Sequence, residues 1–145
     1  MSENPWRNER EDIFDALEYL REIVFEDLDA GPIDPAAFSV QRTYMTLDEI
    51  ADYEDVGAWL EAKRGELLAA DEAEIRQWAY KLRAEHYDDV LRNGIPAVVV
   101  IDTPVFSGLA DGRGRYNLAM ALELDKLPVL LLTEKLARWR KELEA

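Results

Sequence analysis

The sequence has no cysteine and a single histidine, His86, and these two shortages exclude several kinds of chemistry. Without cysteine the chain has no disulfides, no thiolate metal site and no cysteine nucleophile. One histidine leaves few donors for a transition-metal site. His86 lies between Glu85 and Asp88, where it is either a base or a partly exposed structural residue. Carboxylates remain available to hold Mg²⁺ together with phosphate groups.

Long apolar runs are also missing from the sequence. Runs such as residues 127–132 have the length of a strand and are far shorter than the roughly 18–20 residues of a membrane span. Residues 1–12 are polar and have no apolar segment beside them, unlike a secretory signal. We therefore expect a cytoplasmic protein that does not bind membranes.

Cationic residues are scarce, with 17 Lys and Arg against 31 Asp and Glu and a net charge of −14. This balance argues against direct nucleic-acid binding, because such proteins cluster basic residues against phosphates. Three interpretations of the acidity stay open at this point. The acidic surface keeps the protein soluble, binds a basic protein partner, or imitates DNA and so occupies a DNA-binding protein.

The N-terminal part of the 145-residue chain has the pattern of one amphipathic helix. Residues 1–8 are expected to be a loose leader. Apolar residues at spacings of three and four predict a helix over 9–27, with Phe14 and Phe25 widening its apolar stripe. The sequence Asp29-Ala30-Gly31-Pro32 then ends the helix. We therefore divide the chain into an N-terminal helical extension, residues 1–30, and a main domain, residues 31–145.

The middle of the chain is predicted to be mostly helical. Thr46 and Glu49 match a capping box, in which each side chain accepts a hydrogen bond from the other residue's amide. Asp71 is expected to cap a later helix. The predicted elements, in chain order, are a strand over 37–44, a short helix to about Tyr53, a helical turn over 58–64, and a helix over 75–90 that ends near Asn93-Gly94.

The C-terminal half contains two apolar runs, 97–101 and 127–132, which predict strands buried on both faces. A last helix is predicted over 134–143, with Thr133 as its cap. The elements predicted between the two strands are a loop or hairpin over 102–108, a short strand at 109–110, and a helix over 116–124.

The turn Asp111-Gly112-Arg113-Gly114-Arg115 is the segment most suggestive of chemistry. Its glycines allow tight or left-handed backbone geometry and close approach to a ligand. Free amides at the start of the following helix favour an anion, and two arginines add planar donors for phosphate or carboxylate. The alternative is purely structural: the glycines make the turn, Asp111 caps the helix, and the arginines pair with acids. Neither a GxxxxGK[ST] loop nor a GxGxxG fingerprint is present.

Residues 96–132 resemble the core of the ParB/sulfiredoxin-like superfamily. Members show a proline-led apolar strand, a hairpin, a D-G-x-H-R-like turn that opens a helix, an alanine-rich helix and a V-P-V-type strand. The resemblance implies an α/β (α+β) fold with a small mixed sheet and several surrounding helices. The segments that carry the resemblance are 96–101, 109–115, 118–124 and 127–132.

The resemblance also implies a ligand. In that superfamily the turn contacts nucleotide phosphates: CTP in ParB-type clamps, and ATP in sulfiredoxin and the free-serine kinases. By position, Gly112 and the amides of Arg113 and Gly114 would wrap a phosphate, Asp111 would match the motif acid, and Arg115 the motif arginine. Gly114 replaces the usual histidine or arginine. The sulfiredoxin cysteine is absent, which excludes that chemistry.

Two hypotheses follow from these features. The first is a nucleotide- or phosphate-binding domain, with weak hydrolase activity if an acid such as Asp102, Glu49 or Asp48 holds Mg²⁺ or acts as base. The second is a non-catalytic regulator or inhibitor on the same fold, whose acidic surface binds a basic or DNA-binding protein. DNA mimicry belongs to this second hypothesis. Because no helix-turn-helix follows the turn, we do not expect a clamp that reads DNA.

Overall fold

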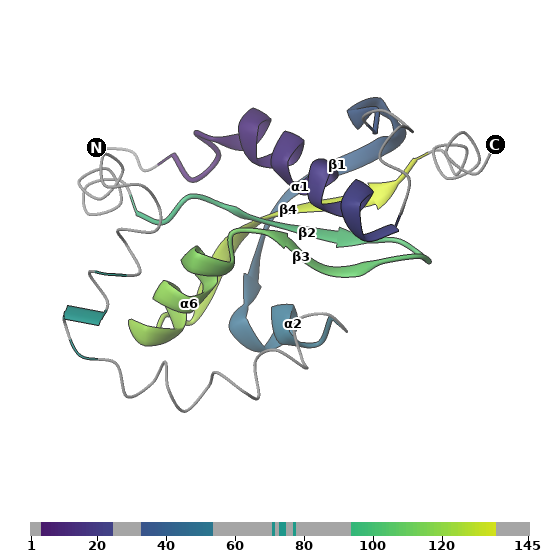
Figure 1. The fold of residues 1–145 in the computed structure, drawn as a ribbon. Coiled ribbons are helices and arrows are strands. Elements are labelled where there is room, and N and C mark those ends of the chain that lie inside the picture. The colour runs from purple at the N-terminus through teal and green to yellow at the C-terminus, as the bar shows by residue number, and fades with distance from the viewer. Residues whose placement is uncertain are drawn as a thin grey trace.

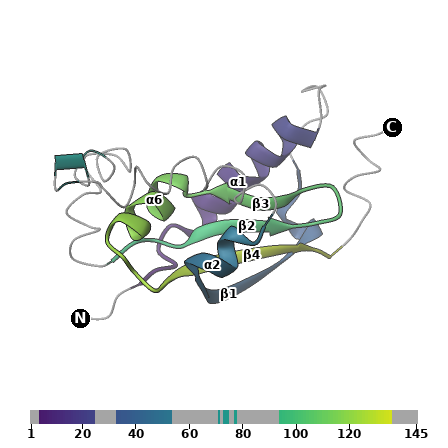
Figure 2. The same cartoon turned by 90° about the horizontal axis from the view of Figure 1, so that it is seen from below.

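A four-stranded mixed sheet with helices on both faces forms the fold seen in the computed structural model (Figures 1 and 2). The structure describes residues 4–24, 33–53, 71, 73–74, 77 and 94–135. The sheet order is β1-β4-β2-β3, in which β2 and β4 are parallel and the two outer pairs are antiparallel. The strands are β1 (Phe38–Thr46), β2 (Val98–Asp102), β3 (Ser107–Asp111) and β4 (Lys126–Glu134). This arrangement confirms the predicted α+β class.

The helices divide between the two faces of the sheet (Figure 1). Helix α1 (Glu9–Val24) covers one face, and α2 (Leu47–Ala51) and α6 (Arg113–Ala121) cover the other. Because side chains alternate along a strand, Val99 and Ile101 pack under α1 whereas Val98 and Val100 pack under α6. All four are fully buried, as predicted for this central strand. Each contributes about 1.5–3 kcal/mol to the core on burial.

Local sequence signals place several elements where they were predicted. Thr46 Oγ1 accepts a hydrogen bond from the Glu49 amide at 3.1 Å, and Glu49 Oε1 accepts one from the Thr46 amide at 3.1 Å. The capping box is therefore confirmed. Asp71 Oδ1 accepts a hydrogen bond from the Glu74 amide at 2.9 Å, as expected of a cap. The predicted element at 58–64 and, apart from residue 77, the predicted helix at 75–90 with His86 lie outside the described residues.

The N-terminal segment packs onto the rest of the fold. Helix α1 buries Ala16, Leu17 and Leu20 against the sheet. The expectation that residues 1–8 form a loose leader is wrong for 4–8, because the Pro5 carbonyl accepts a hydrogen bond from the Ala97 amide at 2.8 Å. The predicted break at 29–32 lies outside the described residues. The helix of the predicted extension is thus one layer of the same packed unit.

Four predicted details differ from the structure. Phe14 does not widen the apolar stripe but is 58% exposed on the outer side of α1. Helix α6 begins at Arg113 and not at Tyr116, because Gly112 takes the N-cap position. Strand β3 is longer than predicted and includes Asp111. The helix predicted over 134–143 does not include Glu134, because β4 extends through that residue in register with β1. Residues 136–143 lie outside the described residues.

Within the described residues, no helix is both long enough and apolar enough to cross a membrane. A short 3-10 helix, η2 (Pro35–Ala37), leads into β1. Tyr116 is fully buried, and its hydroxyl donates to the Leu47 carbonyl at 3.1 Å. This bond ties α6 to the start of α2 on the face opposite α1.

Candidate functional site

The predicted turn joins β3 to α6, and Gly112 gives it its shape. Gly112 is the N-cap of α6 with φ 100° and ψ 26°, in the left-handed region that side chains disfavour. A Cβ built on Gly112 would lie 2.7 Å from Val98 Cγ1 and 3.0 Å from Val98 Cβ. The backbone conformation and the packing of the turn against β2 therefore both require glycine here.

Replacing Gly112 with alanine should destabilise the fold by about 2–4 kcal/mol, from backbone strain together with overpacking against Val98. The matched control is Gly114→Ala, because Gly114 lies in α6 and its φ is not positive. That change should be neutral or stabilise by up to about 1 kcal/mol, since alanine favours helix. Urea unfolding of both variants checks the pair. Equal losses in the two variants would contradict this account of Gly112.

A β-bulge turns Asp111 toward α1. Val100 pairs with Leu109, but the next residue, Val99, pairs with Asp111, so Ala110 is an extra residue on β3. Without this shift, alternation would place Asp111 on the α6 face with Leu109. With it, Asp111 shares the face of Val99, where α1 packs.

Arg115 connects α6 to α1 through a buried ion pair. Its Nη1 donates to Asp12 Oδ2 at 2.7 Å and to the Ala97 carbonyl at 2.8 Å, and its Nη2 donates to Asp12 Oδ1 at 3.3 Å. The side chains of Arg115 and Asp12 are only 13% and 8% exposed. The guanidinium predicted to contact a phosphate is thus directed into the protein, where it positions the turn.

Asp111 lies at the edge of this ion pair. Arg115 Nη1 is 3.8 Å from Asp111 Oδ2, too far for a hydrogen bond. Burial of the carboxyl and the negative charge of Asp12 raise the pKa of Asp111 from 3.8 to about 7, against the opposing effect of Arg115. The charge of Asp15 and a hydrogen bond with Asp12 act in the same direction as burial. Two carboxyls from distant parts of the chain therefore compete for one arginine.

Arg113 lies at the exposed side of the turn. Its Nη2 donates to the Tyr19 hydroxyl at 2.9 Å, and its guanidinium carbon lies 5.6 Å from the centre of the Tyr19 ring. Arg113 is exposed, unlike Arg115. Of the two predicted arginines, it is therefore the one at the surface of the turn.

At the start of α6, several backbone amides donate to no acceptor within the helix. Tyr116 is bonded through its amide to the Gly112 carbonyl at 2.9 Å, and no side chain caps the helix. The amides before Tyr116 thus have no acceptor within the helix, as at other helix starts. One turn further on, Asn117 Oδ1 is buried and accepts no hydrogen bond within the described part of the chain.

The acids predicted to hold a metal lie elsewhere. Asp48 and Glu49 belong to α2, on the face of the sheet opposite α1. Asp102 and Glu49 lie near Tyr53: burial raises the pKa of Tyr53 most, and the charges of these two acids raise it further. The structure therefore does not bring these acids to the 111–115 turn. Over the described ranges, no three acidic or histidine side chains are grouped to hold a metal ion. A separate hollow of about 270 Å³ is lined by Met45, Glu49, Asp52 and Tyr53.

Sequence reasoning did not find Asp12 and Tyr19, the two α1 residues that hold the arginines. They lie about a hundred positions from the turn in the chain, so no local pattern links them to it. One signal was available for Asp12. Asp12 lies one helical turn before the buried residue Ala16 and two before Leu20, on the apolar face of α1, where a carboxylate needs a partner.

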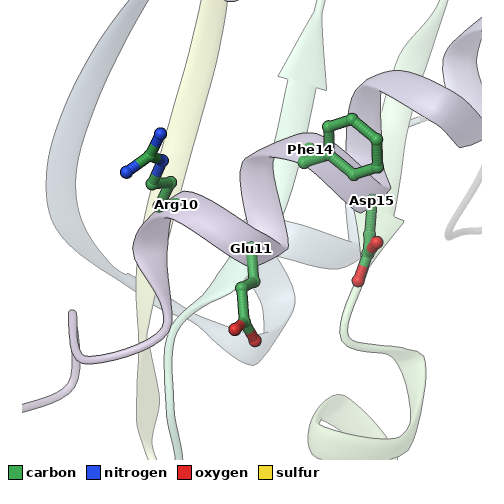
Figure 3. Close-up of a pocket in the computed structure, with 4 residues that line it drawn as sticks. All are labelled: Arg10, Glu11, Phe14 and Asp15. Atoms are coloured by element: carbon green, nitrogen blue, oxygen red, sulfur yellow. The ribbon is translucent and has the colours of Figure 1, made fainter.

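A second feature missed from the sequence lies on the outer side of α1. An open hollow of about 510 Å³ is lined by Arg10, Glu11, Phe14 and Asp15. Figure 3 shows Glu11 and Asp15 pointing to one side of the helix, and Arg10 and Phe14 to the other. Asp15 belongs both to this hollow and to the surroundings of the turn, because its charge contributes to the raised pKa of Asp111.

Comparison with known proteins gives no match, whether to protein-family models, to curated proteins or to solved structures. The functional interpretation therefore depends on the geometry of the site.

Proposed function

We propose that the 111–115 turn binds the phosphate group of a small molecule, with a nucleotide such as ATP or CTP as the first candidate. The observation that carries the proposal is the start of α6. A glycine N-cap in left-handed conformation opens the helix with no side-chain cap. An anion can accept from first-turn amides in such a place, where the helix dipole also favours it.

Each residue of the turn has a defined part in this proposal. Gly112 sets the backbone, and the amides of Gly114 and Arg115 donate to the phosphate. The side chain of Arg113 adds a charged donor from the surface. Arg115 acts through Asp12 and is a positioning residue. The raised pKa of Asp111 leaves part of its population neutral near pH 7, which reduces repulsion of an anion.

Binding, and not hydrolysis, is the function that this geometry favours. Attack by water on a phosphoryl group needs a carboxylate that orients the water and a metal that stabilises the charge. Asp12 and Asp111 are engaged around Arg115, and Asp102 lies at the other end of β2 from Val98, against which Gly112 packs. Mg²⁺ would arrive with the nucleotide phosphates. The proposal includes a cytoplasmic location, where such nucleotides are abundant.

Thermal unfolding with ligand tests this proposal. ATP, CTP and pyrophosphate, each with and without Mg²⁺, should raise the melting temperature if they bind. A ligand at about 100 times its Kd stabilises the folded state by about 2.7 kcal/mol. The melting temperature should then rise by several degrees. No rise with any of these ligands at millimolar concentration would overturn the proposal.

Variants locate the site if a rise is seen. Arg113→Gln should reduce the ligand-induced rise, because it removes the exposed charge at the turn. The matched control is Arg10→Gln, which removes an arginine from the outer side of α1. Arg115→Ala is unsuited to this purpose, since it disrupts a buried ion pair. An equal rise in Arg113→Gln and in the unmodified protein would place the ligand elsewhere.

A further inference from the structure

The outer face of α1 carries a stripe of four carboxylates, Glu11, Asp15, Glu18 and Glu22. They follow one another at spacings of four, three and four residues, so they lie along one side of the helix. Glu18 pairs with Arg21 at 3.0 Å. Across the described residues, the other three carboxylates form no hydrogen bond or ion pair, and all three are exposed.

This stripe weakens the helix that carries it. Like charges three or four residues apart destabilise a helix by about 0.2–0.5 kcal/mol per pair. Glu22 also lies in the last turns of α1, where the helix dipole disfavours an anion. A cationic partner lying along the stripe would relieve both effects. The charge pattern is therefore better explained by binding of a cationic partner than by a contribution to the stability of α1.

An apolar anchor lies next to the carboxylates. Phe14 is 58% exposed, and beside it is the hollow of about 510 Å³ that Glu11 and Asp15 also line. Phe14 directly precedes Asp15 and follows Glu11 by three residues, so its ring lies beside the stripe, on the flank of α1 away from these two acids in Figure 3. An exposed aromatic residue beside charged residues is typical of the anchor of a protein interface.

We propose that the outer face of α1 docks a basic amphipathic helix of a partner protein. This proposal draws on other observations than the phosphate site. The stripe is largely exposed and lies on the side of α1 opposite to the buried residues Ala16 and Leu20, and only Asp15 also acts on the turn, through the pKa of Asp111. Charge complementarity identifies the occupant. The chain has a net charge of −14, and three carboxylates on this face have no partner among the described residues, so the face attracts a cationic segment. Phe14 supplies the apolar contact that a purely charged tail would not use.

The spacing of the acids favours a helix as the occupant. From Glu11 to Glu22 the stripe rises about 16 Å along α1. Lysine or arginine at i, i+4, i+7 and i+11 of a second helix repeats with the same period, so the charges meet when the two helices lie alongside each other. DNA mimicry would need a second row of acids on this face. Among the other acids of the described residues, those of α2 lie on the opposite side of the sheet from α1 and do not form such a row.

Two synthetic peptides test the proposal against the full-length chain. The first is a helical peptide of about 18 residues with lysines at i, i+4, i+7 and i+11 and leucines on the adjoining face. The second has the same composition in scrambled order. Fluorescence anisotropy should show that the patterned peptide binds at least about tenfold more tightly, and that about 0.5 M salt weakens it. Equal affinity of the two peptides, or no binding of either, would overturn the proposal.

Matched charge variants place the peptide on α1. The triple variant Glu11→Gln, Asp15→Asn, Glu22→Gln should weaken binding at least about tenfold, as should Phe14→Ala alone. The control triple variant Asp52→Asn, Glu123→Gln, Asp125→Asn has the same net charge but changes exposed acids elsewhere. It should bind within about twofold of the unmodified protein. Equal weakening by both triple variants would show attraction to net charge and would contradict docking on α1. Circular dichroism checks that each variant is folded.

Discussion

Replacing Arg115 with alanine should destabilise the protein by about 3–5 kcal/mol, the largest effect we expect from a single substitution. Asp12 is 5% exposed, and Arg115 supplies the charged hydrogen bonds that hold its carboxylate, at 2.7 and 3.3 Å. Without Arg115 this carboxylate is a buried charge with no counter-ion, and such losses are costly. The melting temperature should fall by about 10 °C or more.

A double-mutant cycle separates the ion pair from simple loss of packing. If the cost of Arg115→Ala comes from a stranded charge, adding Asp12→Ala should restore part of the lost stability. The control is Arg42→Ala with Glu9→Ala, a pair whose arginine is 56% exposed although its closest contact is also 2.7 Å. Exposed pairs contribute about 0–1 kcal/mol. A loss below about 1 kcal/mol for Arg115→Ala, or strictly additive effects with Asp12→Ala, would contradict the assigned role.

The second large effect is a loss of stability between about pH 4 and pH 8 that depends on Asp111. Burial and Asp12 raise the pKa of Asp111 from 3.8 to about 7. In that range the folded state holds a proton that the unfolded state has released, so stability falls as the pH rises. One pKa unit corresponds to about 1.4 kcal/mol, which gives a loss on the order of 4 kcal/mol.

Asp111→Asn should remove this loss, because asparagine keeps the shape of the carboxylic acid but cannot ionise. The variant and the unmodified protein should be about equally stable near pH 4, and the variant should be more stable near pH 8. Urea unfolding across this pH range measures the difference. The matched control is Asp125→Asn, the same change on an exposed residue. A difference between Asp111→Asn and the unmodified protein that stays constant with pH would show that Asp111 does not hold this proton.

These two predictions concern the same three side chains, and together they bear on the phosphate proposal. Asp12, Asp111 and Arg115 join α1, β3 and α6 at one point. If the turn is held in this way, a ligand at the start of α6 meets a preformed backbone and loses little affinity to ordering it. Raising the pH should weaken binding of an anion, since it adds negative charge at Asp111.

The strands and caps followed from the sequence because their causes are local. The runs at 97–101 and 127–132 are apolar throughout, and only a central strand covered on both faces buries such a run. Thr46 and Glu49 lie three residues apart and complete their own pair of hydrogen bonds. For the same reason the 111–115 turn, including Gly112, was found as a unit.

Contacts between residues far apart in the sequence could not be predicted from local patterns. The register shift that turns Asp111 toward α1 has no signature in the residues around it. The start of α6 was missed by three residues, because the left-handed conformation of Gly112 is fixed by its packing against Val98. The exposure of Phe14 depends on which side of α1 meets the sheet, whereas helical spacing alone assigned it to the apolar stripe.

The sequence by itself thus determined the class of fold, the central strands, the local caps and the position of the glycine-arginine turn. Tertiary structure alone decided what the arginines of that turn do. Arg115 is buried against Asp12, which is 103 positions away in the chain, and Arg113 meets Tyr19, 94 positions away. The physical reason is that a buried charge takes its partner from whatever the fold places beside it, and no local pattern in the chain specifies that neighbour.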